Sequence, residues 1–588
     1  MTTAEIKNLL DVAAGRKAAD LVIKNCQLIS HGDGRIARGE IAITGPYIAA
    51  ITFYENGEPN AAGSVYQAKK VLDAQGAYCS PGLMDAHIHV ESSYLTPEEL
   101  GRLLVPLGTT TIIADPHEIV NVAGIEGFRY MQAAAEKTVL KIEYLVPSCV
   151  PATAFETAGA DLEAADLLPL LEEKNILGLA ELMNYPGVIN ADPAVMAKIM
   201  AAKDLGKLID GHAPGLQGQG LNAYAAAGIL ADHECSTAEE ARARLARGLY
   251  VMLRQGSSCH DLAQLLGAVN ADNYTRCLLC SDDRHADTIL RLGHINEHLQ
   301  ICVQNGLSPL QALRMATLNT AEAFGLNDRG ALFPGRKADL AFFEDLQKFE
   351  AKAVFIDGEL VAQDGHYLPA FERADTSSVR KSFHLGNFNR DKLVLRAKSN
   401  HLRCMILQPG GVLTKAGTCQ VDLDNEGRVL LPADQDLVYL AVVERHKNTG
   451  NVGLGILEGY GLKNGAIATS IAHDSHNILV AGRDQAEMAK AVEALVDQEG
   501  GVVLVQEGKV IANLPLPVAG LMSEEPATEL AQSLSKLEEQ AHRKLGISRE
   551  IDPVMTLSFM SLAVIPELKL TDLGLFDVTQ FKLVDLEA

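Results

Sequence analysis

The feature that most constrains this chain is an eightfold alternation between residues 83 and 306. Short β-rich apolar runs are each followed by an amphipathic stretch with helical periodicity. Eight such units over about 240 residues predict an α/β chain whose parallel strands close into a (β/α)₈ barrel. The predicted strands are 80–89, 109–117, 141–148, 176–182, 207–212, 228–234, 249–255 and 276–282, and the predicted helices are 97–104, 125–137, 162–174, 193–203, 221–227, 237–247, 260–269 and 287–304.

Segments on both flanks of the predicted barrel alternate like antiparallel strands. They are 21–30 and 39–51 before the barrel, and 338–344 and 352–365 after it. Because neither set has enough strands for a stable sheet, we expect one small β-domain built from both. The predicted domains are therefore 20–81 with 326–370, the barrel at 82–325, and, beyond a polar linker at 371–387, a separate α/β or α+β domain at 385–588.

Charge and cysteine usage narrow the class of partner. The 588 residues carry a formal net charge of −24, which repels phosphate backbones and anionic lipid and so disfavours nucleic acid and membrane surfaces. Ten sparse, irregularly spaced cysteines fit a reducing compartment. Charges stand where a signal peptide would have its apolar core, and no run of about 18 uncharged apolar residues follows. We expect a cytoplasmic protein with a small-molecule ligand.

Ionisable side chains recur where the predicted barrel strands end. His87 and His89 are two residues apart at the end of the first strand, so both imidazoles point to one side. A barrel of this type carries its active site at the carboxyl ends of its strands. A lone histidine there is usually a hydrogen-bonded core residue, but a set on one rim predicts a metal site. The predicted ligands are His87, His89, Glu181, His212, His233 and Asp282.

The residue types in this set indicate which ion they would hold. Four histidines and two carboxylates suit Zn²⁺, Fe²⁺ or Mn²⁺, and the absence of cysteine ligands argues against a closed structural zinc site. An open, catalytic site is therefore predicted. Glu181, halfway round the rim, could bridge two ions, and two ions that share a hydroxide would supply both a nucleophile at neutral pH and a Lewis acid.

Longer motifs surround these residues and continue beyond the barrel. They are PGLMDAHIHVESS, ADPHEIVNV, GLAELMNYPGV, DGHAPG, ADHECS and CSDDR, then ATLNTAEAFGLNDRGALFPGRKADLAFFED, and finally GNVGLGILEGYGLKNGAIATSIAHDSHNILVAG and LPLPVAGLMS. From about residue 20 onward the chain resembles the amidohydrolase superfamily and, within it, the adenine deaminase subgroup. Many amidohydrolases use a carboxylated lysine as the bridging ligand, whereas this chain has Glu181, as that subgroup does.

The resemblance implies an activity and roles for particular residues. It implies hydrolytic deamination of adenine to hypoxanthine and ammonia in purine salvage, with two divalent ions (Mn or Fe, with Zn possible) and a homodimer or higher homo-oligomer. Asp282 would be both a ligand and the base, and Glu181 the catalytic bridge. His117, Glu118, Asp283 and Arg284 are placed in rim loops, where they either bind the purine edge or protonate its ring, or are solvated loop residues or salt-bridge partners.

Two other functions stay open from the residues alone. One is an amidohydrolase acting on a cyclic amide, as dihydroorotase does; the other is a catalytically inactive scaffold. Glu181 and the C-terminal region favour the deaminase. Intact candidates for all six ligands argue against a scaffold, because buried polar groups are costly to keep without a use. The HxE and PCxxC signature of cytidine-deaminase zinc sites is absent.

One cysteine pair and one further histidine pair stand out in the sequence. Cys277 and Cys280 form a CxxC motif inside an apolar strand, which predicts buried structural cysteines. His473 and His476 fall in a turn between two predicted strands, where histidines are usually exposed and inert. The alternative hypothesis is that this turn faces the barrel mouth, where it helps enclose substrate or binds an extra ion.

Overall fold

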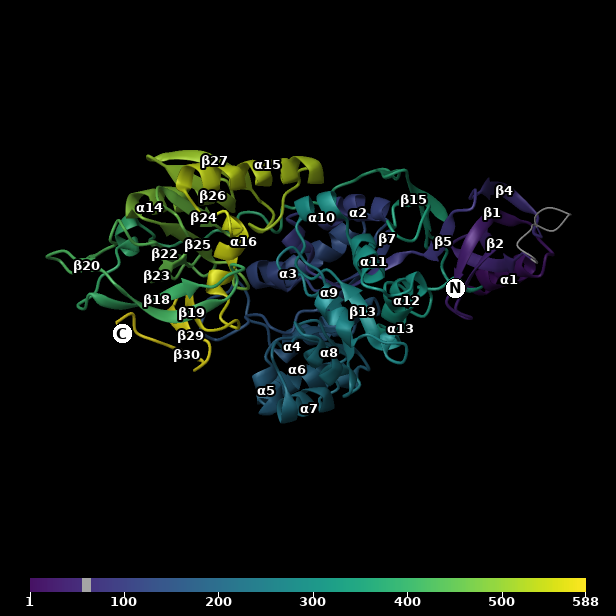
Figure 1. The fold of residues 1–588 in the computed structure, drawn as a ribbon, viewed down its shortest axis with the longest axis horizontal. Coiled ribbons are helices and arrows are strands. Elements are labelled where there is room, and N and C mark those ends of the chain that lie inside the picture. Colours follow the sequence, from purple (N-terminus) through teal and green to yellow (C-terminus); the bar gives the residue numbers. More distant parts are fainter. Residues whose placement is uncertain (55–64, 588) are drawn as a thin grey trace.

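The computed structural model describes residues 1–54 and 65–587, so residues 55–64 and 588, within the predicted 20–81 and 385–588 domains, lie outside the described residues. Three bodies follow one another along the long axis of the molecule (Figure 1): an N-terminal β-domain, a barrel and a C-terminal domain. No helix in the described part of the chain is both long and apolar enough to cross a membrane.

The first body is a sheet that takes strands from both flanks of the barrel. β5 (Tyr78–Pro81) pairs with β1 on one side and antiparallel with β14 on the other, where Cys79 lies opposite Phe342. The two flanks therefore share one hydrogen-bonded sheet and one apolar core. Its other strands are β1 (Ala19–Ser30), β2 (Arg35–Thr44), β3 (Tyr47–Phe53), β4 (Ala68–Asp73), β14 (Leu340–Phe343), β15 (Ala351–Ile356), β16 (Glu359–Gln363) and β17 (His366–Tyr367), and helix α1 (Thr3–Ala13) packs on it.

The second body is the predicted barrel, and its fold class is confirmed. Each predicted strand contains one observed parallel strand. The eight strands form two hydrogen-bonded sheets, one of β6 to β10 and one of β11 to β13. The Leu230 amide donates to the Ile209 carbonyl at 2.8 Å, and Ile88 bridges to Asp282, so the two sheets join into a ring. The strands are β6 (Leu83–Ile88), β7 (Thr109–Ala114), β8 (Lys141–Val146), β9 (Ile176–Leu182), β10 (Leu208–Gly211), β11 (Ala231–Asp232), β12 (Tyr250–Arg254) and β13 (Cys277–Cys280).

Three predicted barrel helices differ from those observed. Helix α3 (His117–Ala135) begins eight residues before the predicted 125, with a break at Gly124, whose φ of 59° is not helical. The predicted helix 287–304 is two helices, because Gly293 has a φ of 106° and interrupts it. The predicted helix 260–269 is short, because α9 spans only Leu262–Leu265. The remaining helices are α2 (Pro97–Leu104), α4 (Ala164–Leu171), α5 (Tyr185–Ile189), α6 (Pro193–Asp204), α7 (Gly218–Ala226), α8 (Ala238–Leu245), α10 (Ala286–Leu292), α11 (Ile295–Gln304), α12 (Pro309–Met315) and α13 (Leu318–Ala323).

The third body is built on an eight-stranded mixed sheet in the order β19-β18-β23-β22-β25-β24-β26-β27, with helix α14 packed on β24, β25 and β26. The central strand β22 is buried at every position, whereas most residues of the edge strand β19 are exposed. The elements are β18 (His401–Leu407), β19 (Thr414–Gln420), β20 (Asp422–Leu423), β21 (Val429–Leu430), β22 (Leu437–Val443), β23 (Val452–Glu458), β24 (Ala466–Thr469), β25 (Ile478–Gly482), α14 (Gln485–Asp497), β26 (Gly501–Gln506), β27 (Lys509–Pro515), α15 (Ala527–Gln540), α16 (Pro553–Ser558), β28 (Leu568–Thr571), β29 (Gly574–Asp577) and β30 (Lys582–Leu583).

The C-terminal domain is hydrogen-bonded to loops and to helix α2, which follow the carboxyl ends of barrel strands. The Ser523 amide donates to the Tyr94 carbonyl at 2.8 Å, and the Ala527 amide donates to Glu99 at 3.1 Å. On the loop after β8, Thr157 donates to Asp572 through both its amide and its hydroxyl. These contacts hold the third body over the rim on which the candidate site residues lie.

Candidate active site

Four of the predicted ligands meet where the barrel ring closes. His87 is the last residue but one of β6, His89 directly follows that strand, and Asp282 lies just after β13. His89 Nε2 lies 3.2 Å from both His87 Nε2 and Asp282 Oδ1, and 3.7 Å from Glu181 Oε1. All four side chains are buried, and Asp282 has a left-handed φ of 55°, a strained conformation of the kind found at functional sites.

Glu181 connects this group to the two remaining predicted ligands. Its Oε2 lies 3.0 Å from His212 Nδ1 and 3.1 Å from His233 Nε2, while its Oε1 faces His89. Burial raises the pKa of Glu181, but His212 and His233 outweigh it and hold the pKa well below its usual range. An ionised carboxylate thus lies between two groups of imidazoles, the arrangement that a bridging ligand needs.

Groups behind the candidate ligands fix the orientation of their side chains. Asp210 lies 3.4 Å from Nδ1 of His87, and the Asp115 carbonyl lies 3.0 Å from Nδ1 of His89, so the Nε2 atoms point inward. The guanidinium of Arg254 donates to Asp282 Oδ2 at 2.8 Å and also contacts Glu234. The donor set therefore fits one or two divalent ions of the Mn, Fe or Zn type.

The sequence analysis did not predict the residues that orient the candidate ligands, although the positions of three of them at strand ends could have indicated them. Asp115, Asp210 and Arg254 lie at or next to the ends of β7, β10 and β12, the positions used to choose the ligands. Tyr224 carried no such signal, because it lies in α7. Its hydroxyl accepts the His212 amide at 2.9 Å and donates to the Leu182 carbonyl at 3.0 Å, which ties β9 to the end of β10 behind Glu181.

A cleft lies above the candidate ligands. Its floor is the set around Glu181, and its roof comes from the C-terminal domain, whose apolar lining is Val412, Phe559, Leu562 and Ile565. A pocket with an apolar wall and a few convergent polar groups is typical of a site for a small molecule. The other lining residues are His89, His117, Glu118, Met183, His212, His233, Glu234, Arg254, Cys259, Asp282, Asp283, His473 and Asp474.

Three of the four predicted substrate-contact residues line this cleft, and one does not. Asp283 belongs to the loop after β13, but His117 and Glu118 begin helix α3, so their expected placement in loops was wrong. Arg284 donates to the Gln255 carbonyl at 2.6 Å, to the Gly293 carbonyl at 2.9 Å and to Glu297. Its buried guanidinium holds neighbouring loops together and does not line the cleft, so for Arg284 the structure favours the alternative of a salt-bridge partner over a substrate contact.

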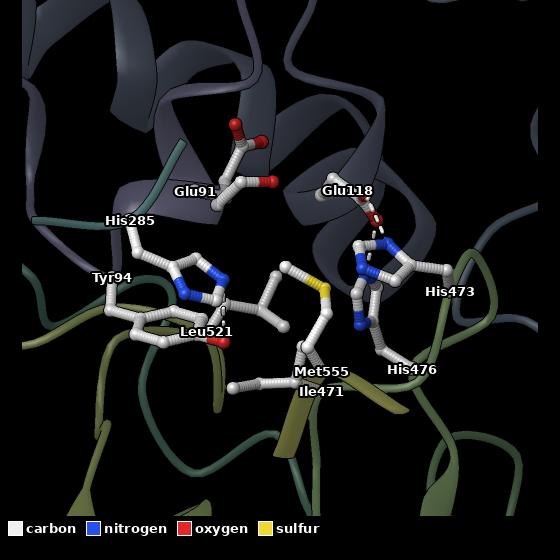
Figure 2. A pocket seen from close by; sticks show the side chains of 10 residues that line it. Glu91, Tyr94, Glu118, His285, Ile471, His473, His476, Leu521 and Met555 are labelled. Carbon is white, nitrogen blue, oxygen red and sulfur yellow. Dashed lines mark hydrogen bonds and ion pairs between the residues drawn. The ribbon is translucent and has the colours of Figure 1, made fainter. Parts of the chain in front are cut away.

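The HDSHN turn between β24 and β25 is buried against the barrel. His473 is 5% and His476 1% exposed, and both contact the carboxylate of Glu118 (Figure 2). The expectation that such histidines are exposed is therefore wrong, and the turn faces the barrel mouth. Cys277 and Cys280, by contrast, are buried in β13 with free thiols, as the sequence predicts.

Comparisons with known proteins agree with this architecture. The family model described as the amidohydrolase family matches residues 78–361, and the one described as the adenine deaminase C-terminal domain matches residues 411–582. The chain is 49% identical to adenine deaminase 2 of Desulfotalea psychrophila and 48% identical to adenine deaminase of Ligilactobacillus salivarius, each over 100% of both chains. It is 39% identical to adenine deaminase of Clostridium acetobutylicum, over 98% of this chain and 99% of that one.

Proposed function

This chain belongs to the adenine deaminase family, and we propose that it catalyses the hydrolysis of adenine to hypoxanthine and ammonia. The observation that carries the proposal is the position of Glu181, between His89 on one side and His212 and His233 on the other, beneath a cleft closed by the C-terminal domain. The relatives that match this chain over its whole length bear the name of that activity.

We assign the metal ligands in two groups around one bridge. His87, His89 and Asp282 would hold one divalent ion, His212 and His233 the other, and Glu181 both. Two ions, Mn or Fe with Zn as the third choice, would supply an activated water and a Lewis acid when bound. The contacts of Asp210 and Asp115 to His87 and His89 support this assignment, because they turn one nitrogen of each ring toward the bridge.

The remaining roles fall to residues that line the cleft. Asp282 accepts the proton that the attacking water loses, and Arg254 holds its second oxygen in place. The flat purine would lie against the apolar wall formed by Phe559 and Leu562, with Asp283 within reach of its polar edge. Ser92 donates to Asp283 and fixes the direction of its carboxylate.

The proposal is tested by substrate comparison on metal-loaded protein. Adenine, adenosine, cytosine and dihydroorotate are supplied separately, and ammonia release and ultraviolet absorbance are followed. We expect conversion of adenine to hypoxanthine far faster than turnover of the other three. Greater activity on dihydroorotate would assign the cyclic-amide reaction instead, and no activity on adenine at full metal occupancy would refute the deaminase. Removal of metal should abolish turnover and Mn²⁺ or Fe²⁺ should restore it.

We also propose the setting in which the protein works. Ten free cysteines support a reducing, cytoplasmic location, and an adenine-hydrolysing activity would serve purine salvage. We propose that the domains are 20–81 with 326–370, 82–325 and 385–588. We also propose that the protein forms a homodimer or higher homo-oligomer and binds neither nucleic acid nor membrane. Light scattering on the purified protein measures the oligomeric state, and limited proteolysis at the 371–387 linker tests the last boundary.

A further inference from the structure

A second, small pocket adjoins the candidate active site where the C-terminal domain meets the barrel, and Figure 2 shows the side chains around it. His473 and Glu118 line both this pocket and the substrate cleft, so they form the wall between the two. Both are buried, His473 at 5% and Glu118 at 2% exposure. The other side chains around the pocket are Glu91, Ser92, Tyr94, His285, Ile471, His476, Leu521 and Met555.

Both histidines of the HDSHN turn contact the carboxylate of Glu118. Nδ1 of His473 donates to Oε1 at 2.7 Å, and Nε2 of His476 contacts Oε2. The amide of Ala472 donates to Nδ1 of His476 at 3.2 Å, so Nδ1 must offer its lone pair and the proton of neutral His476 is on Nε2, facing Glu118. A metal ion at Glu118 would need the lone pair of that same Nε2. The cluster is therefore a proton-sharing network and not a metal site.

The other ring nitrogen of His473 is available for chemistry. Its Nδ1 is committed to Glu118, and within residues 1–54 and 65–587 no group is hydrogen-bonded to its Nε2. The imidazole lines the substrate cleft and packs against the ring of Phe559, with ring centroids 4.9 Å apart. A carboxylate that accepts a hydrogen bond from one imidazole nitrogen fixes the ring and directs the other nitrogen at a substrate.

We propose that His473 is the acid that protonates the purine ring nitrogen next to the reacting carbon, and that Glu118 is the positioning residue that orients it. The inference rests on the proposed adenine deamination. As the oxygen of water bonds to the carbon, one water proton passes to Asp282 and the ring nitrogen takes a proton from Nε2 of His473. Asp282 then gives its proton to the amine, the carbon–nitrogen bond breaks with its electron pair, and ammonia leaves. The hydroxyl proton on the product carbon is lost as the carbonyl forms, which restores the proton of His473.

The charges around His473 keep it in the protonated form. Burial lowers its pKa, but Glu118, Asp283 and Asp474 outweigh burial and raise the pKa of His473 to about 9. His476 lies on the same turn, and burial keeps its pKa below the usual value. His117 also lies near Glu118, with its Nε2 3.6 Å from Oε1. An acid must be protonated in the free enzyme, so kcat/KM of the wild type should fall as the pH rises through about 9.

The test compares His473→Gln and Glu118→Gln with His401→Gln, a control at an exposed position on β18 of the same domain. Each variant is checked for folding by circular dichroism and for metal content. His473→Gln should lower kcat/KM for adenine by about 10² or more while it keeps the wild-type metal content, and the fall near pH 9 should disappear. His401→Gln should match the wild type throughout.

Glu118→Gln separates an orienting role from a merely structural one. It retains the imidazole of His473 but removes the carboxylate that raises its pKa, so the fall in kcat/KM should move from about pH 9 toward the ordinary histidine value of about 6.5. Loss of metal from His473→Gln, full activity of that variant, or an unshifted profile in Glu118→Gln would each overturn the inference. Inactivity of the metal-loaded wild type on adenine would instead refute the proposed function.

Discussion

Replacing Tyr224 by Phe removes one oxygen atom behind the candidate metal centre. The hydroxyl is fully buried, accepts the amide of His212 and donates to the carbonyl of Leu182, the residue after Glu181. Each backbone group left unpaired costs about 1–3 kcal/mol, so the free energy of unfolding should fall by about 2–6 kcal/mol. Since these bonds fix the backbone at the proposed ligand His212 and next to the proposed ligand Glu181, metal affinity should weaken by about 10- to 100-fold, or about 1.4–2.7 kcal/mol.

The assay is a titration of metal-free protein with Mn²⁺ against a competing chelator, together with urea unfolding. Tyr144→Phe is the matched control, because the Tyr144 hydroxyl is also buried and donates to one carbonyl, that of Met131 at 2.9 Å, away from every proposed ligand. The control should lose about 1 kcal/mol of stability and keep its metal affinity. Equal metal affinity in Tyr224→Phe and the wild type, or equal weakening in both variants, would refute the reasoning.

Three further predictions address the ligands and the roof of the cleft. Glu181→Gln should lower metal content, measured by elemental analysis, because a neutral amide bridges poorly; unchanged occupancy and activity would exclude the bridge. Asp282→Asn should lower kcat for adenine by about 10² or more, measured at saturating metal, and a smaller loss would mean that another residue is the general base. Burial lowers the pKa of Lys569 to about 7 from 10.5, so the unfolded chain binds this proton more tightly. The free energy of unfolding of the wild type, measured in urea relative to Lys569→Met, should therefore rise by about 2–3 kcal/mol from pH 7 to 9. If the difference between the two proteins does not depend on pH, the lowered pKa of Lys569 is contradicted.

The barrel and the positions of its candidate ligands could be predicted from local sequence patterns. A strand alternates its side chains with a period of two, so HxH at a strand end sends both imidazoles to one side wherever the strand lies. Glu181, His212, His233 and Asp282 could be placed on the same rim because parallel strands in a barrel end at one face. Helix starts were harder to predict. Helix α3 begins at His117, and the residues before its break at Gly124 are largely buried, so no amphipathic period marks this first part of the helix.

The contacts between distant segments were decided by packing alone. Glu118 and His473 are 355 residues apart and meet only because the C-terminal domain covers the barrel mouth. Arg284 adjoins Asp283 in sequence, yet its guanidinium is buried among loop carbonyls while Asp283 lines the cleft. By itself the sequence determined the barrel, the rim and the candidate ligands, since these depend on period and strand direction. The tertiary structure decided the roof, the groups that orient the candidate ligands and the partner of each histidine, since these depend on which surfaces two separately patterned domains bury against each other.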